Sequence, residues 1–153
     1  MKLTEHFFLE EFLENDHNLI LKPGLKEINN IKTLCEKVLE PLREKFCIPI
    51  KISSGYRDHV LNELVGGSIN SDHLYGFAAD FQTEDPFDLI KMYAWIIRAL
   101  PFNQVIFYLM DDLKCRWVHV SYKPGQNKRE IIVSELGVKY RFEIWLKQIL
   151  HCG

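Results

Sequence analysis

The sequence predicts an α+β fold, in which a small single domain spanning residues 1–153 has a mainly antiparallel sheet flanked by helices. Helical periodicity dominates the first part of the chain, and strand-like alternation dominates the later part. The link "DDLK" (111–114) between two strand-like segments has the length of a hairpin connection, which makes its neighbours antiparallel. Apolar residues make up 47 % and charged residues 26 % of the chain, a balance that supports a folded core.

The clearest predicted helix covers residues 24–46, and a shorter one is expected over 3–15. We expect Pro41 to bend or split the long helix, since proline lacks an N–H group. Apolar residues recur at three or four positions along the long helix and would form one buried face: Leu25, Ile28, Ile31, Leu34, Val38, Leu42 and Phe46.

Two further helical segments are expected in the middle of the chain. Residues 58–67 should form one or two turns closed by Gly66 and Gly67. Residues 85–100 should form a helix that Asp85 caps and that has Pro86 in its first turn. One side of this helix would be apolar through Leu89, Met92, Tyr93 and Ile96.

Strands are predicted over 48–55, 76–82, 104–110, 115–122 and 128–134, whereas residues 139–150 are expected to close the chain as a helix. In 115–122 the alternation separates two faces. Val118, Val120 and Tyr122 lie on a face suited to the core, and Trp117, His119 and Ser121 lie on the other face. His119 is therefore expected to point toward a cleft.

Charge and hydropathy exclude several classes of partner. The net charge of −2 with no long basic run argues against nucleic-acid binding. Glu5, Glu10 and Glu11 interrupt the N-terminal apolar residues, so no signal peptide is predicted, and no segment is apolar enough to span a membrane. We expect a monomer that is synthesised in the cytoplasm and does not associate with membranes.

The segment "SDHLYGFAADF" (71–81) contains a possible metal site. His73, Asp80 and His119 form a His, His, carboxylate set, which catalytic zinc sites use while leaving one position for water. Gly76 and the two following alanines suit a backbone that passes close to another group. Spacing alone leaves another interpretation open, namely a surface histidine beside a capping aspartate.

Three segments resemble one family. "SSGYR" (53–57), "LNELVGGSINSDHLYGFAADF" (61–81) and "WVHVSY" (117–122) look like the zinc D-alanyl-D-alanine carboxypeptidases and related peptidoglycan peptidases of bacteria and phages. "LTEHF", "LEEF" and "CEKVLEPLRE" resemble the short, single-domain branch of that family. The resemblance implies a small α+β fold shared with the hedgehog signalling domain.

The resemblance also implies roles for particular residues. His73, Asp80 and His119 would bind zinc, and the cofactor would activate water for attack on a peptide bond in the peptidoglycan stem. Arg57 would bind the substrate and stabilise the oxyanion, a role that suits a permanently charged planar group. Ser71 would contact the substrate or a metal ligand, although a turn or capping role is an equal alternative. The absence of a signal peptide suits a phage lysis or virion-associated protein, or a cytoplasmic prophage product, that acts on the cell wall.

The general base expected from the resemblance is missing. Many members carry an acidic residue three positions before the last histidine, where this chain has Arg116. The short branch carries a glutamate near the end of the preceding strand, where this chain has Tyr108. Asp111 in the predicted hairpin link is a candidate substitute, or it is simply a solvated turn residue.

Three interpretations therefore remain. The first is an active zinc peptidase, either a carboxypeptidase or an endopeptidase, with a displaced base. The second is a zinc-binding domain that binds peptidoglycan or a protein with little hydrolysis. The third is a virion or structural protein that retains the fold. Because the chain has no large insertion, we expect an open cleft that admits a polymer.

Overall fold

The computed structural model describes residues 1–109, 115–135 and 138–141. Its α+β architecture is centred on one six-stranded mixed sheet in the order β1-β2-β4-β3-β5-β6. The strands are β1 (Lys51–Ser54), β2 (Ala78–Gln82), β3 (Gln104–Leu109), β4 (Cys115–Ser121), β5 (Glu130–Glu135) and β6 (Val138–Arg141). Every neighbouring pair is antiparallel except β3 and β5, which are parallel. The mainly antiparallel sheet predicted from the sequence is confirmed.

The predicted long helix forms as three consecutive parts, α1 (Leu25–Leu34), the π-helical η2 (Cys35–Leu39) and α2 (Glu40–Phe46). Pro41 lies in the first turn of α2. Its missing N–H group and bulky ring disfavour the α-helical pairing with the preceding turn, and the wider π register lies directly before it. The helix therefore changes register near Pro41. Leu25, predicted on the buried face, is 81 % exposed, because α1 begins there, beyond the edge of the core.

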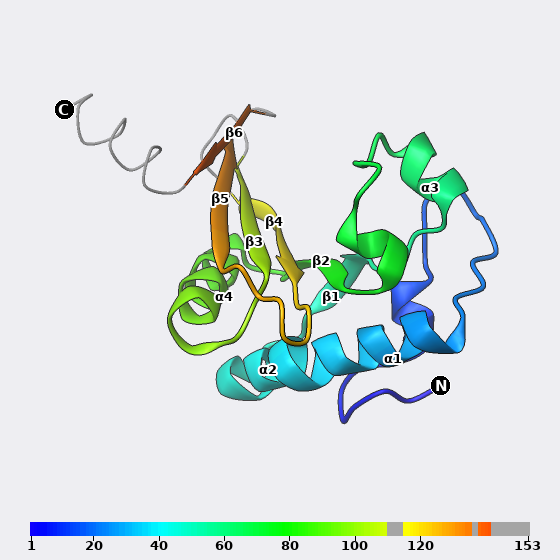
Figure 1. The fold of residues 1–153 in the computed structure, drawn as a ribbon. Coiled ribbons are helices and arrows are strands. Elements are labelled where there is room, and N and C mark those ends of the chain that lie inside the picture. Colours follow the sequence, from blue (N-terminus) through cyan, green and yellow to red (C-terminus); the bar gives the residue numbers. More distant parts are fainter. Residues whose placement is uncertain (110–114, 136–137, 142–153) are drawn as a thin grey trace.

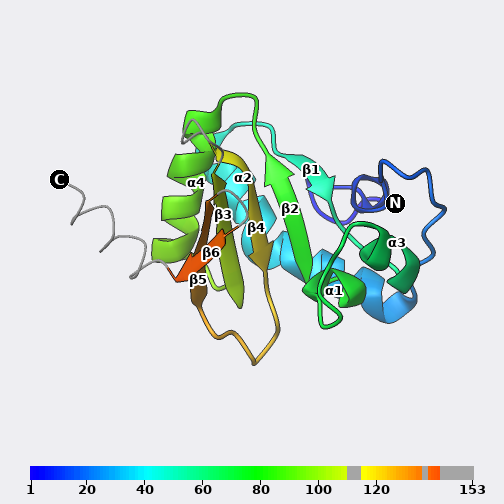
Figure 2. The ribbon, with the colours of Figure 1, turned by 90° about the horizontal axis from the view of Figure 1, so that it is seen from above.

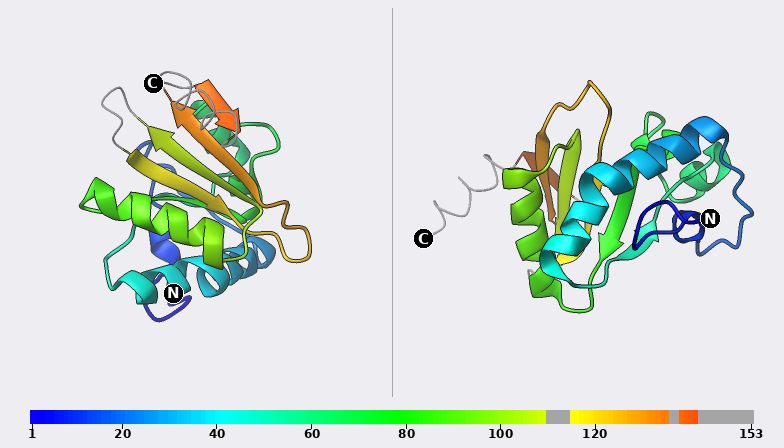
Figure 3. Two further views of the ribbon diagram at one scale, coloured as in Figure 1. Left: turned by 90° about the vertical axis from the view of Figure 1, so that its left-hand side faces the viewer. Right: turned by 90° about the horizontal axis from the view of Figure 1, so that it is seen from below.

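Helices cover one face of the sheet, as Figures 1 and 3 show. The long helix crosses beneath the strands, and α4 (Pro86–Ala99) packs against β3 and β4 and contacts α2. Asp85 caps α4 through the backbone N–H of Phe87 at 2.9 Å, as predicted. The core between these layers contains fully buried residues from both: Ile31, Leu34, Val38, Leu42, Phe81, Leu89, Met92, Ile96, Val118 and Val120.

The other face of the sheet is approached by two short helices, α3 (His59–Leu64) and the 3₁₀ turn η3 (Asp72–Tyr75). Asp58 caps α3 through the N–H of Leu61 at 2.8 Å. Figure 2 shows α3 beyond the β1 and β2 side of the sheet, away from α4. The loop from α3 to η3 therefore forms one wall of the opening over the sheet.

Two sequence predictions are wrong at the ends of the chain. Residues 3–15 form only the 3₁₀ turn η1 (Leu9–Phe12), because the chain folds back in a bridge between Lys2 and Phe8 and buries Phe7 and Phe12. Core packing outweighs the weak propensity of a short isolated helix. Residues 139–141, predicted to begin a helix, lie in β6 and pair with the free edge of β5. The rest of that predicted helix, residues 142–150, lies outside the described residues.

No helix in the described parts of the chain combines the length and the apolar character that crossing a membrane requires.

Candidate metal centre

Pairing within the sheet brings two of the predicted ligands together. Asp80 on β2 lies directly opposite His119 on β4, and His119 lies opposite Ile106 on β3. Val118 and Val120 are fully buried on the core side, so His119 projects from the opposite face, as the alternation predicted. Two ligands that are 39 residues apart in the sequence thus become neighbours through strand register.

The third ligand comes from the turn η3, which the sequence analysis did not predict. Ser71 accepts a hydrogen bond from the N–H of His73 at 3.4 Å at the start of the turn, and Gly76 ends the turn with a φ of 71°. A Cβ atom on Gly76 would lie 2.5 Å from the carbonyl oxygen of Glu27 in α1. The close approach that the small residues indicated is therefore to helix α1. This contact fixes the turn that carries His73.

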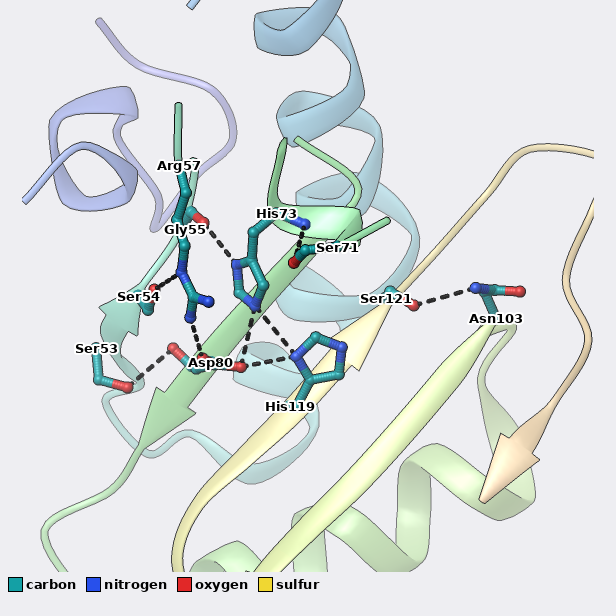
Figure 4. A network of polar contacts seen from close by, with 10 residues as sticks. All are labelled: Ser53, Ser54, Gly55, Arg57, Ser71, His73, Asp80, Asn103, His119 and Ser121. Atoms are coloured by element: carbon teal, nitrogen blue, oxygen red, sulfur yellow. Dashed lines mark hydrogen bonds and ion pairs between the residues drawn. The ribbon is translucent and has the colours of Figure 1, made fainter. Parts of the chain in front are cut away.

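The side chains of His73, Asp80 and His119 converge, with one possible donor atom from each lying within 4.8 Å of the others. His73 Nε2 is 3.2 Å from His119 Nδ1 and 3.3 Å from Asp80 Oδ1. Asp80 Oδ1 is 2.7 Å from His119 Nδ1. Figure 4 shows the three groups meeting between η3, β2 and β4. Donors arranged tetrahedrally at ~2.0–2.1 Å from zinc are about 3.3 Å apart, so this set fits one such ion.

The surroundings hold the histidines in the form that binds a metal. His73 Nδ1 lies 2.6 Å from the carbonyl oxygen of Gly55 and therefore carries the proton, which leaves Nε2 as a lone-pair donor. Burial lowers the pKa of His119, and the hydrogen bond that Asp80 accepts from its ring only partly opposes this effect. A neutral imidazole is the form that coordinates a metal.

Asp80 is the charged centre of the site. Burial acts to raise its pKa, but the charges and hydrogen bonds of His73 and His119 outweigh burial and hold the pKa well below its ordinary value. Asp80 Oδ2 also accepts a hydrogen bond from Arg57 Nη2 at 3.0 Å. The carboxylate thus stays ionised while it is only 9 % exposed. A buried carboxylate beside two imidazole side chains is a suitable donor set for a divalent transition metal.

A model of the Peptidase M15 family matches residues 5–121 of this chain, which include all three converging residues and Arg57. The chain belongs to the peptidase M15 family. M15 enzymes are metallopeptidases, in agreement with the metal-binding donor set. No curated protein matches the sequence.

A cleft with a volume of about 650 Å³ is lined by the predicted ligands, by Arg57 and by most of the loop from Val65 to Asp72. Strand register sets three parallel rows of residues on this face of the sheet, and side chains from each row line the cleft. We call Asp80, His119, Ile106 and Ile132 the ligand row, Trp117, Tyr108 and Ser134 the aromatic row, and Ser121, Gln104 and Glu130 the charged row. Adjacent rows are two residues, or ~6.6 Å, apart along a strand.

Arg57 lies beside the predicted ligands. Its Nε donates to Ser54 Oγ at 2.9 Å, and its Nη2 donates to Asp80. Its Nη1 has no hydrogen-bond partner among the described residues, and the side chain lines the cleft. The motif glycine, Gly55, allows close packing on Phe12, since a Cβ there would lie 2.5 Å from the Phe12 backbone. Arg57 therefore both supports a metal ligand and offers a charged donor to the cleft.

The two base positions of the family contain no carboxylate here. Tyr108 stacks on Trp117 with ring centroids 4.5 Å apart. Burial, together with the charge of Asp80, raises the pKa of Tyr108 to about 12. Tyr108 is thus a neutral phenol at neutral pH, and a neutral phenol donates hydrogen bonds and is a poor base. Asp111 and the side chain of Arg116 lie outside the described residues.

Ser71 is the N-cap residue of η3, and it also lines the cleft. The charged row and its neighbours were not predicted from the sequence. Asn103 donates to Asp72 Oδ2 at 3.0 Å, and Lys123 Nζ lies 2.5 Å from Asp72 Oδ1. Asp72 precedes His73, so this cluster holds the metal-binding turn against β3 and β4. In the sequence, the only indication of this cluster is that the charged residue Asp72 directly precedes the predicted ligand His73.

Proposed function

We propose that this M15 protein is a zinc-dependent peptidase that hydrolyses a peptide bond in the peptidoglycan stem. The observation that carries the proposal is the convergence of His73, Asp80 and His119 at the floor of an open cleft with Arg57 beside them. These three side chains would hold the ion. When bound, zinc supplies Lewis acidity, which lowers the pKa of water and polarises a carbonyl group.

Residues of the chain itself would orient the peptide. Arg57 Nη1, which has no hydrogen-bond partner among the described residues, would offer a charge-assisted hydrogen bond to a substrate carboxylate or carbonyl oxygen in the cleft. The bond would strengthen as negative charge develops on that oxygen, so Arg57 would favour the transition state over the bound substrate. The open cleft supports a substrate that is part of a polymer.

Proton transfer is the weak step of this proposed mechanism. The cleft carboxylates in the described part of the chain are Asp72, Asp80 and Glu130. Asp72 is paired with Lys123, Asp80 belongs to the ligand set, and Glu130 accepts from Gln104 Nε2 at 2.5 Å. None stands at the position of the family base, so the proposed activity is slow unless Asp111 serves as the base.

The experiment is digestion of purified peptidoglycan by the protein after zinc loading, after chelation, and after zinc is restored. Mass spectrometry should detect new peptide termini that disappear on chelation and return with zinc. A parallel Asp111→Asn variant should lose activity if that residue is the base. No cleavage by fully zinc-loaded protein, including a Tyr108→Glu variant, would replace the peptidase with the second candidate.

That second candidate is a zinc-containing domain that binds peptidoglycan with little hydrolysis. It is favoured by one observation, the stacked and protonated Tyr108 at the base position. In both cases the proposed place of action is the bacterial cell wall, reached from a phage particle or from within a phage-infected cell.

A further inference from the structure

The end of the cleft at the charged row holds one cation and one anion that the metal centre does not use. Glu130 begins β5 and lies beside Gln104, one row from His119. Lys128, two residues earlier, lines the same cleft. The intervening Arg129 points away, because its guanidinium donates to the carbonyl oxygens of Leu100 and Ile97 at 2.9 and 2.6 Å.

A buried asparagine fixes both charged residues relative to the metal ligands. Lys128 N–H donates to Asn103 Oδ1 at 3.3 Å, and Glu130 N–H donates to the Asn103 carbonyl oxygen at 2.9 Å. Asn103 is 8 % exposed, and its amide nitrogen donates to Asp72, the residue before His73. The backbone that carries the two charges is therefore tied to the turn that carries a ligand.

Lys128 and Glu130 differ from the neighbouring charged residues in their ion pairing. Asp72 and Lys123 pair with each other at 2.5 Å. Within the described ranges no ion pair involves Lys128 or Glu130, and the Glu130 carboxylate is held only by the neutral amide of Gln104. The Lys128 ammonium, which has no ion-pair partner in the described part of the chain, and the oriented Glu130 carboxylate thus belong to residues two positions apart at the same end of the cleft.

This arrangement is complementary to a zwitterion. We propose that Lys128 and Glu130 bind the ammonium and carboxylate at the end of a substrate side chain, so that stem peptides with diaminopimelate are preferred over those with lysine. The inference rests on the proposed function, because it names the substrate class of the same cleft. A lysine side chain offers only the ammonium, so it would use Glu130 and leave Lys128 unpaired.

The experiment compares two soluble, uncross-linked stem peptides that differ only in diaminopimelate or lysine. Binding to the zinc-loaded protein is measured by calorimetry, and kcat/KM by mass spectrometry. Wild type should prefer the diaminopimelate peptide. Lys128→Ala should reduce this preference about threefold, a small effect because the lysine is exposed. Glu130→Gln should weaken binding of both peptides by roughly tenfold, since the lost hydrogen bond involves a charged group. Lys45→Ala, an exposed lysine on α2, is the matched control and should leave the preference unchanged.

The outcomes separate the inference from the proposed function. Equal binding of the two peptides by wild type overturns the inference, even if both are cleaved. A preference in binding without cleavage supports the inference and contradicts the peptidase activity. If Glu130→Gln abolishes kcat for both peptides while their binding is unchanged, Glu130 transfers protons and the zwitterion site is wrong.

Discussion

The ligand row and the aromatic row are neighbours on one face of the sheet, yet they are built for different chemistry. In the ligand row, Asp80 accepts from Arg57 and contacts both histidines, and all of these groups are largely buried. In the aromatic row, Tyr108 stacks on Trp117 and its phenol stays protonated. The difference teaches that holding a metal and moving a proton depend on separate residues, two positions apart on the same strands.

The largest effect is expected from breaking the ligand row. His119→Ala should weaken zinc binding by more than about a hundredfold, because even indirect supporting residues change metal affinity by ~10–100-fold. Zinc titration with a competing chelator measures the affinity. His59→Ala removes an exposed histidine outside the ligand set and should leave affinity unchanged. Equal affinity of His119→Ala and wild type would remove His119 from the site.

Arg57→Ala tests the link between the ligand row and the substrate. Losing a preorganised donor to a developing oxyanion costs ~10²–10³ in turnover. Because Arg57 also bonds Asp80, the assay should be run at saturating zinc with bound metal measured in parallel. Arg57→Lys retains charge without the planar fork and should recover only part of the rate. Unchanged turnover in the alanine variant would exclude Arg57 from the reaction.

Tyr108→Glu tests whether the aromatic row limits the rate. A positioned general base contributes typically 10²–10⁴-fold, so restoring the carboxylate should raise peptidoglycan hydrolysis by about a hundredfold. Tyr108→Phe keeps the ring stacked on Trp117 but removes the hydroxyl, and it should not accelerate hydrolysis. A brisk wild-type rate that neither variant changes would show that the proton acceptor lies elsewhere.

The smallest effect is expected at Asp72, which touches the ligand row only through the turn that carries His73. Asp72→Asn removes the charge paired with Lys123 and should reduce zinc affinity by less than about tenfold. Asp88→Asn breaks a comparable pair with Lys91 on α4, away from the cleft, and serves as the control. A loss as large as that of His119→Ala would mean that the turn does not form without this pair.

Local sequence patterns predict some features of the site and not others. Alternation along β4 placed His119 on the cleft face, because a strand period of two is a local property. The meeting of His73 with Asp80 depends on η3 and on the pairing of β2 with β4, which no local pattern contains, and the family resemblance supplied it. Residues 3–15 are predicted as a short helix from the sequence, whereas burial of Phe7 and Phe12 accompanies a folded-back segment in the structure. No sequence pattern predicted a role for Lys128 and Glu130, because charged residues are common at the start of a strand. Their place in the cleft is visible only in the structure.

The measurement that most directly tests the metal centre is the zinc content of folded, tag-free protein before and after reconstitution, determined by elemental analysis. The convergence of His73, Asp80 and His119 predicts one zinc per chain that chelation removes and added zinc restores. A folded protein whose zinc content stays well below one per chain after reconstitution would contradict the account.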